Sequence, residues 1–112
     1  MKDLKKFIGR KIVIKIDRPV GSKHPKYGFT YPINYGYFEG YKMPDGEDLD
    51  AYVLGTTKQS KEISGTCIAI IHRINDDDDK LVVSVNGKNF SNQEIEKIIL
   101  FQEKYFQHEI WQ

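Results

Sequence analysis

Residues 31–54 read YPINYGYFEGYKMPDGEDLDAYVL, and this stretch decides the fold. Proline and glycine residues recur through it, and both residue types interrupt helices. They lie at Pro32, Gly36, Gly40, Pro44 and Gly46. The end of the stretch, residues 50–54, is a short apolar run of the kind found in strands. The stretch therefore predicts strands and loops rather than a helix.

Further strands are predicted on both sides of this stretch. From residue 11 to 17 the sequence alternates, with three isoleucines on one face, as a half-buried strand requires. This alternation places Asp17 on the opposite face. Residues 66–74 and 81–85 are also short, rich in β-branched residues and bounded by turn residues. About five strands are therefore expected.

The pattern changes to a helical one near the C-terminus. Ser91 and Glu94 have the spacing of a capping box, which marks the first turn of a helix. Apolar and aromatic residues then recur at helical spacing as far as Phe106. We therefore expect one C-terminal helix that begins after Ser91 and packs on the sheet.

Length and composition limit the fold to one domain. The chain has 112 residues and a mass of 13.0 kDa, whereas a typical domain has roughly 150 residues. It is 39% hydrophobic and 29% charged, which is typical of a globular protein and excludes a collagen-like or coiled-coil chain. The elements together predict a mainly β, α+β fold. We expect a small OB-like β-barrel of about five strands with a C-terminal helix, spanning residues 1–112 as a single domain.

Nothing in the sequence indicates a membrane or secretory segment. The longest apolar run, residues 68–71, is far shorter than the roughly 18 to 20 residues of a membrane-spanning helix. The basic N-terminal segment is not followed by the apolar region of a secretory signal. A cytoplasmic protein with no membrane partner is therefore expected. The single cysteine, Cys67, cannot form an internal disulfide and is expected to be a buried strand thiol.

Charged residues are placed unevenly along the chain. The formal net charge is +1, yet residues 1–26 hold nine lysines and arginines against two aspartates. Eight of the sixteen acidic residues lie in two short segments, residues 45–50 and 76–79. Two carboxylates about 5 Å apart repel by about 3 kcal/mol at an effective dielectric constant near 20, so such clusters favour a bound cation or protonation. For residues 76–79 alone, a solvated turn is the favoured interpretation.

The acidic segment at residues 45–50 is the stronger candidate for a metal site. It follows Pro44 and leads into a strand, so its carboxylates lie where a loop meets a rigid element. Glu47 and Asp50 converge only if the chain bends between them, and the neighbouring Pro44 and Gly46 make that bend credible. Hard oxygen ligands suit Mg²⁺ or Mn²⁺. Neither acidic run has the spacing of an EF-hand loop, and the three scattered histidines do not form a zinc-ligand pair.

Two segments of the sequence resemble a known family. Tyr31-Pro32-Ile33-Asn34-Tyr35-Gly36-Tyr37 and Asp45-Gly46-Glu47-Asp48-Leu49-Asp50 are similar to the signature of soluble inorganic pyrophosphatases of the β-barrel class. Further segments resemble this family in the same order along the chain: Ile16-Asp17-Arg18-Pro19, Lys26-Tyr27, residues 75–80 and Phe101-Gln102-Glu103-Lys104-Tyr105. The last of these resembles the start of the family's C-terminal helix, with its active-site tyrosine. The resemblance covers most of the chain.

The resemblance implies roles for individual residues. The implied metal ligands are Asp17, Asp45, Glu47, Asp50 and Asp78 or Asp79. The implied substrate contacts are Lys26, Tyr35, Lys80 and Tyr105, with Lys23 as a further cation for the substrate. The implied catalytic residues are Glu47, Asp50 and Tyr35, with Glu47 as a metal ligand or as the base that activates water.

The sequence also departs from the pattern of that family. Glu47 stands where the family has an aspartate, Asn75 where a metal ligand is an aspartate, and Phe106 where a lysine binds phosphate. A hairpin with a phosphate-binding arginine is missing as well. The candidate replacements for this arginine are Lys23, Arg18 and Arg73.

The function expected from these features is Mg²⁺-dependent hydrolysis of pyrophosphate, or of a related small phosphoanhydride, by metal-activated water. The alternative is a catalytically degenerate protein that binds metal and a phosphorylated ligand without turnover. A nucleic-acid-binding module is a third hypothesis, because small barrels bind single strands through exposed aromatic residues. The net charge of +1 argues against it. The resembling family commonly forms oligomers, so a homo-oligomer is an open expectation.

Overall fold

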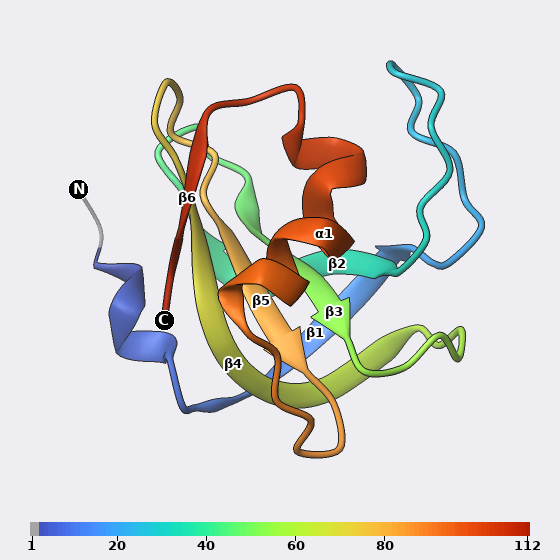
Figure 1. Ribbon diagram of the computed structural model, residues 1–112, viewed down its shortest axis with the longest axis vertical. Coiled ribbons are helices and arrows are strands. Elements are labelled where there is room, and N and C mark those ends of the chain that lie inside the picture. Colours follow the sequence, from blue (N-terminus) through green and yellow to red (C-terminus); the bar gives the residue numbers. More distant parts are fainter. Residues whose placement is uncertain (1–2) are drawn as a thin grey trace.

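Five strands close into a barrel in the computed structural model, which describes residues 3–112 (Figure 1). The strands are β1 (Lys11–Arg18), β2 (Asn34–Lys42), β3 (Asp48–Leu54), β4 (Glu62–Arg73) and β5 (Lys80–Ser84). They pair in the order β1-β2-β3-β5-β4, and β4 returns to pair with β1. The β3–β5 pair is parallel, and the other pairs of the barrel are antiparallel. The expected five-strand barrel is therefore confirmed.

Three further elements lie outside the barrel strands. A short 3₁₀ helix, η1 (Leu4–Phe7), precedes β1, and the helix α1 (Asn92–Glu103) follows β5. The expected capping box is present, because the Ser91 side chain accepts from the Glu94 N–H while the Glu94 carboxylate accepts from the Ser91 N–H. A sixth strand, β6 (His108–Trp111), pairs with the outer edge of β4. The sequence did not predict this strand.

Several element boundaries differ from the sequence-based expectation. The helix was expected to continue to Phe106, but it ends at Glu103 because the chain must turn into β6. The segment from Phe101 to Tyr105 is therefore the end of the helix rather than its start. Strand β4 begins at Glu62 rather than at residue 66, because residues 62–66 pair with β1 and close the barrel.

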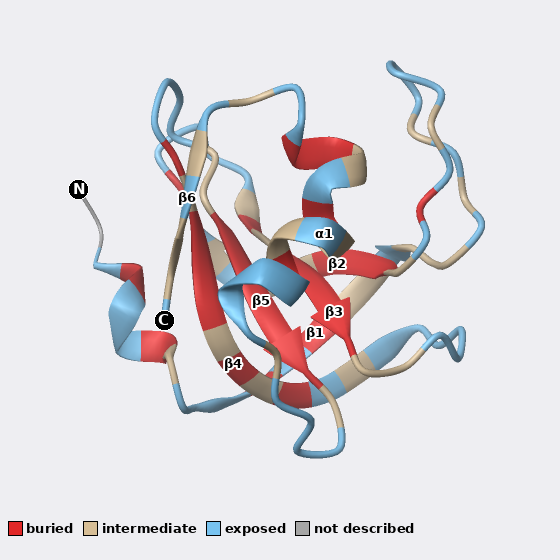
Figure 2. Ribbon diagram, in the orientation of Figure 1, coloured by how far each residue is buried: buried red, intermediate tan, exposed pale blue. Residues whose placement is uncertain are grey.

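Two apolar clusters hold the fold together, one inside the barrel and one beneath α1. Alternate residues of β3 point to opposite sides, so Ala51 and Val53 belong to the barrel interior while Tyr52 and Leu54 meet the helix. Both faces of β3 and β5 are consequently buried (Figure 2). Cys67 is buried inside the barrel, as expected, and burial raises the pKa of its thiol to about 11.

A projecting segment between β1 and β2, residues 19–33, is called the arm here (Figure 1). Its aromatic side chains pack towards the end of α1. The ring of Tyr27 stacks on that of Tyr105 with centroids 4.7 Å apart, and Phe29 meets Phe101 edge-on at 5.4 Å. These contacts join the arm to the end of α1, although Tyr27 and Tyr105 remain exposed.

None of the helices within residues 3–112 has the length and apolar character that crossing a bilayer requires.

Candidate active site

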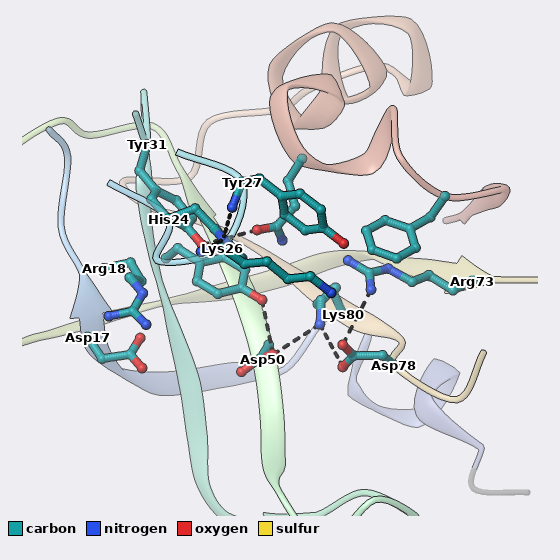
Figure 3. Close-up of a pocket in the computed structure, with 13 residues that line it drawn as sticks. Asp17, Arg18, His24, Lys26, Tyr27, Tyr31, Asp50, Arg73, Asp78 and Lys80 are labelled. Atoms are coloured by element: carbon teal, nitrogen blue, oxygen red, sulfur yellow. Dashed lines mark hydrogen bonds and ion pairs between the residues drawn. The ribbon is translucent and has the colours of Figure 1, made fainter. Parts of the chain in front are cut away.

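Two neighbouring pockets share a wall of three aspartates, Asp17, Asp50 and Asp78. The first has a volume of about 370 Å³ and is called the basic pocket (Figure 3). Its cationic lining residues are Arg18, Lys26, Arg73 and Lys80. The second has a volume of about 390 Å³ and is called the acidic pocket. Its other lining residues are Tyr37, Lys42, Asp45, Glu47 and Asp48.

Each aspartate of the shared wall comes from a different part of the barrel. Asp17 lies at a register shift in β1, where Ile16 and Arg18 pair with successive residues of β2. Such a bulge re-aims the side chain of the extra residue. Asp50 lies between two buried residues of β3, so strand alternation turns it away from the barrel interior. Asp78 lies in the β4–β5 loop, two residues before β5 begins.

Lys80 connects two of these aspartates. It is the first residue of β5 and pairs in register with Asp50 on β3. Its Nζ atom lies 3.0 Å from Asp50 Oδ2 and 2.6 Å from Asp78 Oδ1, and the side chain is only 1% exposed. A buried ammonium group needs such partners, because an unpaired charge there costs several kcal/mol, on the order of 3–5. Lys80 is therefore a fixed positive charge in the floor of the basic pocket.

Tyr35 donates a hydrogen bond from its hydroxyl to Asp50 Oδ2 at 3.0 Å. Burial raises the pKa of Tyr35 well above its usual value, and the negative charge of Asp50 raises it further. Burial also raises the pKa of Tyr31, its neighbour in the pocket, to about 12. Both phenols consequently remain protonated at neutral pH and serve as hydrogen-bond donors.

Arg73 is held by the end of the helix α1. Its Nε and Nη2 atoms donate to the two carboxylate oxygens of Glu103 at 3.0 and 2.9 Å, and Nη1 donates to Asp78 Oδ2 at 3.3 Å. Burial alone would lower the pKa of Arg73, but the hydrogen bonds and charge of Glu103 raise it. Glu103 also accepts from the hydroxyl of Tyr52. The guanidinium is therefore charged and has little freedom to move.

The acidic pocket is lined by exposed carboxylates. Asp45 and Glu47 are exposed, and the Asp45 carboxylate accepts from the backbone N–H of Glu47 at 2.9 Å. This bond closes a turn between Pro44 and the start of β3. The bend was expected between Glu47 and Asp50, but β3 already begins at Asp48, so the turn lies before that interval. Asp48 forms an ion pair with Lys42 at 2.7 Å. The pocket is thus lined by two solvent-facing carboxylates in addition to the shared wall.

Most of the site residues named from the sequence come together around these pockets. Lys26, Tyr35 and Lys80 line the basic pocket, and Figure 3 shows the Lys26 side chain reaching across it. Asp45 and Glu47 line the acidic pocket. The aspartates Asp17, Asp50 and Asp78 lie between them.

Three of the named residues are used elsewhere. Asp79 accepts from the backbone N–H of Arg73 at 2.9 Å and pairs with His72 Nδ1 at 3.0 Å. Lys23 lies in the arm, where it forms a β-bridge with Thr30. Tyr105 is exposed and stacks on Tyr27. None of the three lines either pocket.

Other residues of the basic pocket were not predicted as site residues. His24, Tyr31 and Gln102 line it. Tyr31 and Gln102 lie within segments that resemble the family but were given no role, and no sequence pattern marks His24. Arg18 and Arg73 were named only as candidate replacements for a missing arginine, and both line the pocket. Lys23, the third candidate, does not. The ion pair between Arg73 and Glu103 could not be found from the sequence, because thirty residues separate the two partners.

The donor chemistry of the shared wall fits a hard divalent cation. Asp17 is an exposed residue, but partial loss of solvent raises the pKa of its carboxyl group. The charge of Arg18 lowers this pKa, and the charge of Asp50 raises it. A cation beside Asp17 and Asp50 would relieve this repulsion. Among residues 3–112, however, no three carboxylate, imidazole or thiolate groups converge closely enough to hold an ion as they stand. Asp50 and Asp78 are instead hydrogen-bonded to Lys80.

The structure is thus a small five-strand barrel with a cation-lined pocket next to a cluster of carboxylates. No protein-family model matches the sequence, and no curated protein sequence matches it.

Solved structures of bacterial inorganic pyrophosphatases have a similar fold. The enzyme from Ehrlichia chaffeensis shares 18% identity over 94% of this chain and 86% of its own, with a TM-score of 0.65. The enzyme from Neisseria gonorrhoeae shares 18% identity over 92% of this chain and 81% of its own, with a TM-score of 0.65. The enzyme from Thermus thermophilus shares 17% identity over 99% of this chain and 84% of its own, with a TM-score of 0.63. The chain therefore has the pyrophosphatase fold, as its sequence resemblance implies.

Proposed function

We propose that this protein hydrolyses inorganic pyrophosphate, or a closely related phosphoanhydride, with Mg²⁺ as its cofactor. The observation that carries the proposal is the shared wall of Asp17, Asp50 and Asp78, which separates a pocket rich in cations from one rich in carboxylates. Attack of a cation-activated water on a phosphate anion needs these two environments in contact. The likeness to solved pyrophosphatases supports the same class of substrate.

The residues that would hold Mg²⁺, or Mn²⁺ in its place, are the three aspartates of the shared wall together with Asp45 and Glu47. When bound, such an ion lowers the pKa of a coordinated water and offsets the negative charge of the phosphate oxygens.

The chain's own groups bind and orient the phosphates. Lys80 is already fixed by two carboxylates, so its charge needs no reorganisation when an anion enters. Lys26 extends from the arm and contributes a second cation. Tyr35, kept protonated by burial, holds Asp50 by donating to Oδ2.

Glu47 is the proposed base. It is exposed and lines the acidic pocket together with the shared wall, and its backbone N–H is fixed by the Asp45 carboxylate. Its carboxylate is proposed to accept the proton that the attacking water releases.

A second candidate function is binding of a phosphorylated ligand without turnover. The observation that favours it is that Asp50 and Asp78 are hydrogen-bonded to Lys80, while no cluster of three metal-ligating groups is assembled within residues 3–112. A protein of this kind would bind phosphate through Lys26 and Lys80 and release no product.

Phosphate release from pyrophosphate, with Mg²⁺ and with chelator, separates these functions. We expect release that requires Mg²⁺ and falls by about 100-fold or more in Asp50→Asn, because loss of a charged ligand weakens both metal binding and the reaction. Asp77→Asn is the matched control, since it removes the same charge from an exposed residue that lines neither pocket. Equal rates in wild type and Asp50→Asn would contradict the proposal. Phosphate binding without release would support the second candidate.

A further inference from the structure

The guanidinium group of Arg73 is in contact with Glu103, Phe106 and Asp78. Two of its nitrogens meet both oxygens of Glu103, a residue with no exposed surface. Its guanidinium carbon lies 3.6 Å from the ring centroid of Phe106, so the ring covers one face of the group. A third nitrogen, Nη1, reaches Asp78. The side chain is therefore prepositioned before any ligand binds.

The remaining hydrogen-bonding capacity of Arg73 is directed to the basic pocket. A guanidinium has five N–H donors, and the bonds to Glu103 and Asp78 use one each on Nε, Nη1 and Nη2. Nη1 also lies 3.7 Å from Asp76 Oδ2, so its second N–H already faces a carboxylate. The second N–H of Nη2 is used by none of these three carboxylates. Arg73 is only 4% exposed yet lines the basic pocket beside Lys80 and Phe106. A buried donor facing a polar cavity is satisfied best by an anion.

We propose that Arg73 is a phosphate-binding residue of the basic pocket and that Glu103 and Phe106 are its positioning residues. This inference rests on the proposed function for its ligand class, which is a phosphoanhydride or its phosphate product. The planar fork of arginine matches two phosphate oxygens, whereas lysine acts as a point charge. Arg73 thus complements Lys80, and the pocket gains one directional contact besides its charge.

The placement explains why a buried Arg73–Glu103 pair is kept in such a small protein. A buried ion pair contributes little net stability compared with apolar residues of similar volume. Glu103 instead fixes the plane of the guanidinium, and Phe106 prevents it from turning towards the solvent. Both positioning residues come from the end of α1 and the turn that follows it, so the helix fixes one wall of the pocket.

The test is the affinity for inorganic phosphate, measured by calorimetry in the presence of Mg²⁺, together with KM for pyrophosphate. The main variant is Arg73→Met combined with Glu103→Gln, which removes both charges of the pair and keeps an acceptor for the Tyr52 hydroxyl. We expect its dissociation constant for phosphate to rise by about 10- to 100-fold, because a charge-assisted hydrogen bond is lost. Arg10→Met is the matched control, because Arg10 is exposed and lies outside both pockets.

Two further variants separate a binding role from a structural one. Arg73→Lys retains the charge without the fork, and we expect about a tenfold loss of phosphate affinity with the fold intact. Adding Phe106→Lys to the main variant places a new cation at the same wall, and we expect it to recover part of the lost affinity. A merely structural Arg73 would give neither the loss in Arg73→Lys nor this recovery.

The outcomes distinguish this inference from the proposed function. Phosphate affinity that depends on Arg73 in a protein that releases no phosphate from pyrophosphate would support the inference and contradict the function. If the protein hydrolyses pyrophosphate, and Arg73→Lys and the folded main variant keep the wild-type phosphate affinity and KM, the proposed function is supported and the inference about Arg73 is contradicted. Absence of phosphate binding by the wild-type protein would overturn the inference.

Discussion

Asp50 and Lys80 are register partners in the parallel strand pair β3–β5, and Lys80 Nζ lies 3.0 Å from Asp50 Oδ2. Because the two strands run in the same direction, they begin at the same end of the barrel. The loops that carry Asp45 and Asp78 precede these strands and meet at that end as well. The parallel pair thus brings the two acidic segments of the sequence to one site, and a single lysine joins Asp50 to Asp78.

Replacing Lys80 by methionine should reduce both stability and activity. The variant leaves Asp50 and Asp78 to repel each other without the shared ammonium group. We expect a loss of about 1–2 kcal/mol in the free energy of unfolding, less than for a fully buried pair, because both aspartates reach solvent. Urea unfolding measures this loss, and phosphate release should fall by about 100-fold or more.

Lys61→Met is the control for this variant, because Lys61 is exposed and lines neither pocket. Wild-type phosphate release by Lys80→Met would show that the basic pocket does not bind the substrate through this residue.

Gly36 should tolerate no side chain. It pairs with Ile16 where β1 and β2 approach closely, and a Cβ atom there would lie 1.8 Å from the backbone oxygen of Lys15. We expect Gly36→Ala to lower the free energy of unfolding by roughly 2–4 kcal/mol, because the strands must separate to admit the methyl group.

Gly40 provides the comparison. It has a positive φ of 88° but no atom within 4 Å of an added Cβ, so Gly40→Ala should lose only about 1–2 kcal/mol from backbone strain. Urea unfolding of both variants measures the difference. Equal losses in the two would contradict the steric role of Gly36 at the close approach of β1 and β2.

The parts of the fold that follow from local patterns were predictable. Alternation in residues 11–17 gave the first strand, and the Ser91–Glu94 capping box gave the start of α1, because both signals depend only on near neighbours. Strand β6 was missed, since His108–Trp111 is short and becomes a strand only because the outer edge of β4 is available to pair with it.

Individual residues of the candidate site were predictable, but contacts between distant segments were not. Resemblance named Asp50 and Lys80, but four consecutive aspartates are chemically identical in the sequence, so it could not choose between Asp78 and Asp79. That choice depends on how the loop enters β5. The Arg73–Glu103 pair is a contact between distant segments that no spacing rule reveals.

The turn that carries Lys26 should depend on pH. His24 Nδ1 accepts from the backbone N–H groups of Lys26 and Tyr27 at 3.0 and 3.1 Å, which requires an unprotonated nitrogen. Burial lowers the pKa of His24, and the charges of Arg18 and Lys26 lower it further. A histidine with a lowered folded-state pKa stabilises the fold above its unfolded value, and this contribution is lost as the pH falls through the lowered value.

The amide resonances of Lys26 and Tyr27 are the measurement for this titration. We expect them to be constant at and above neutral pH and to shift together in acid, with phosphate affinity falling in parallel. His24→Asn should remove the shift, because an asparagine side chain accepts the same bonds without titrating. An equal acid shift in His24→Asn would assign the titration to another group.

Asp78 and Asp79 should differ in their effect on phosphate release, although they are adjacent and chemically identical. Asp78 lines both pockets and contacts Lys80 and Arg73, so Asp78→Asn should reduce phosphate release by about 100-fold or more. It should also lower the free energy of unfolding by about 1 kcal/mol, because Lys80 and Arg73 lose one carboxylate but keep Asp50 and Glu103. Asp79 faces His72 and the backbone N–H of Arg73 instead. Asp79→Asn should therefore lower the free energy of unfolding by about 1 kcal/mol and leave most of the phosphate release intact. Rates and urea unfolding of the two variants are measured side by side, and we expect the loss of phosphate release in Asp78→Asn alone. A loss of release in Asp79→Asn that matches the loss in Asp78→Asn would instead identify Asp79 as part of the site.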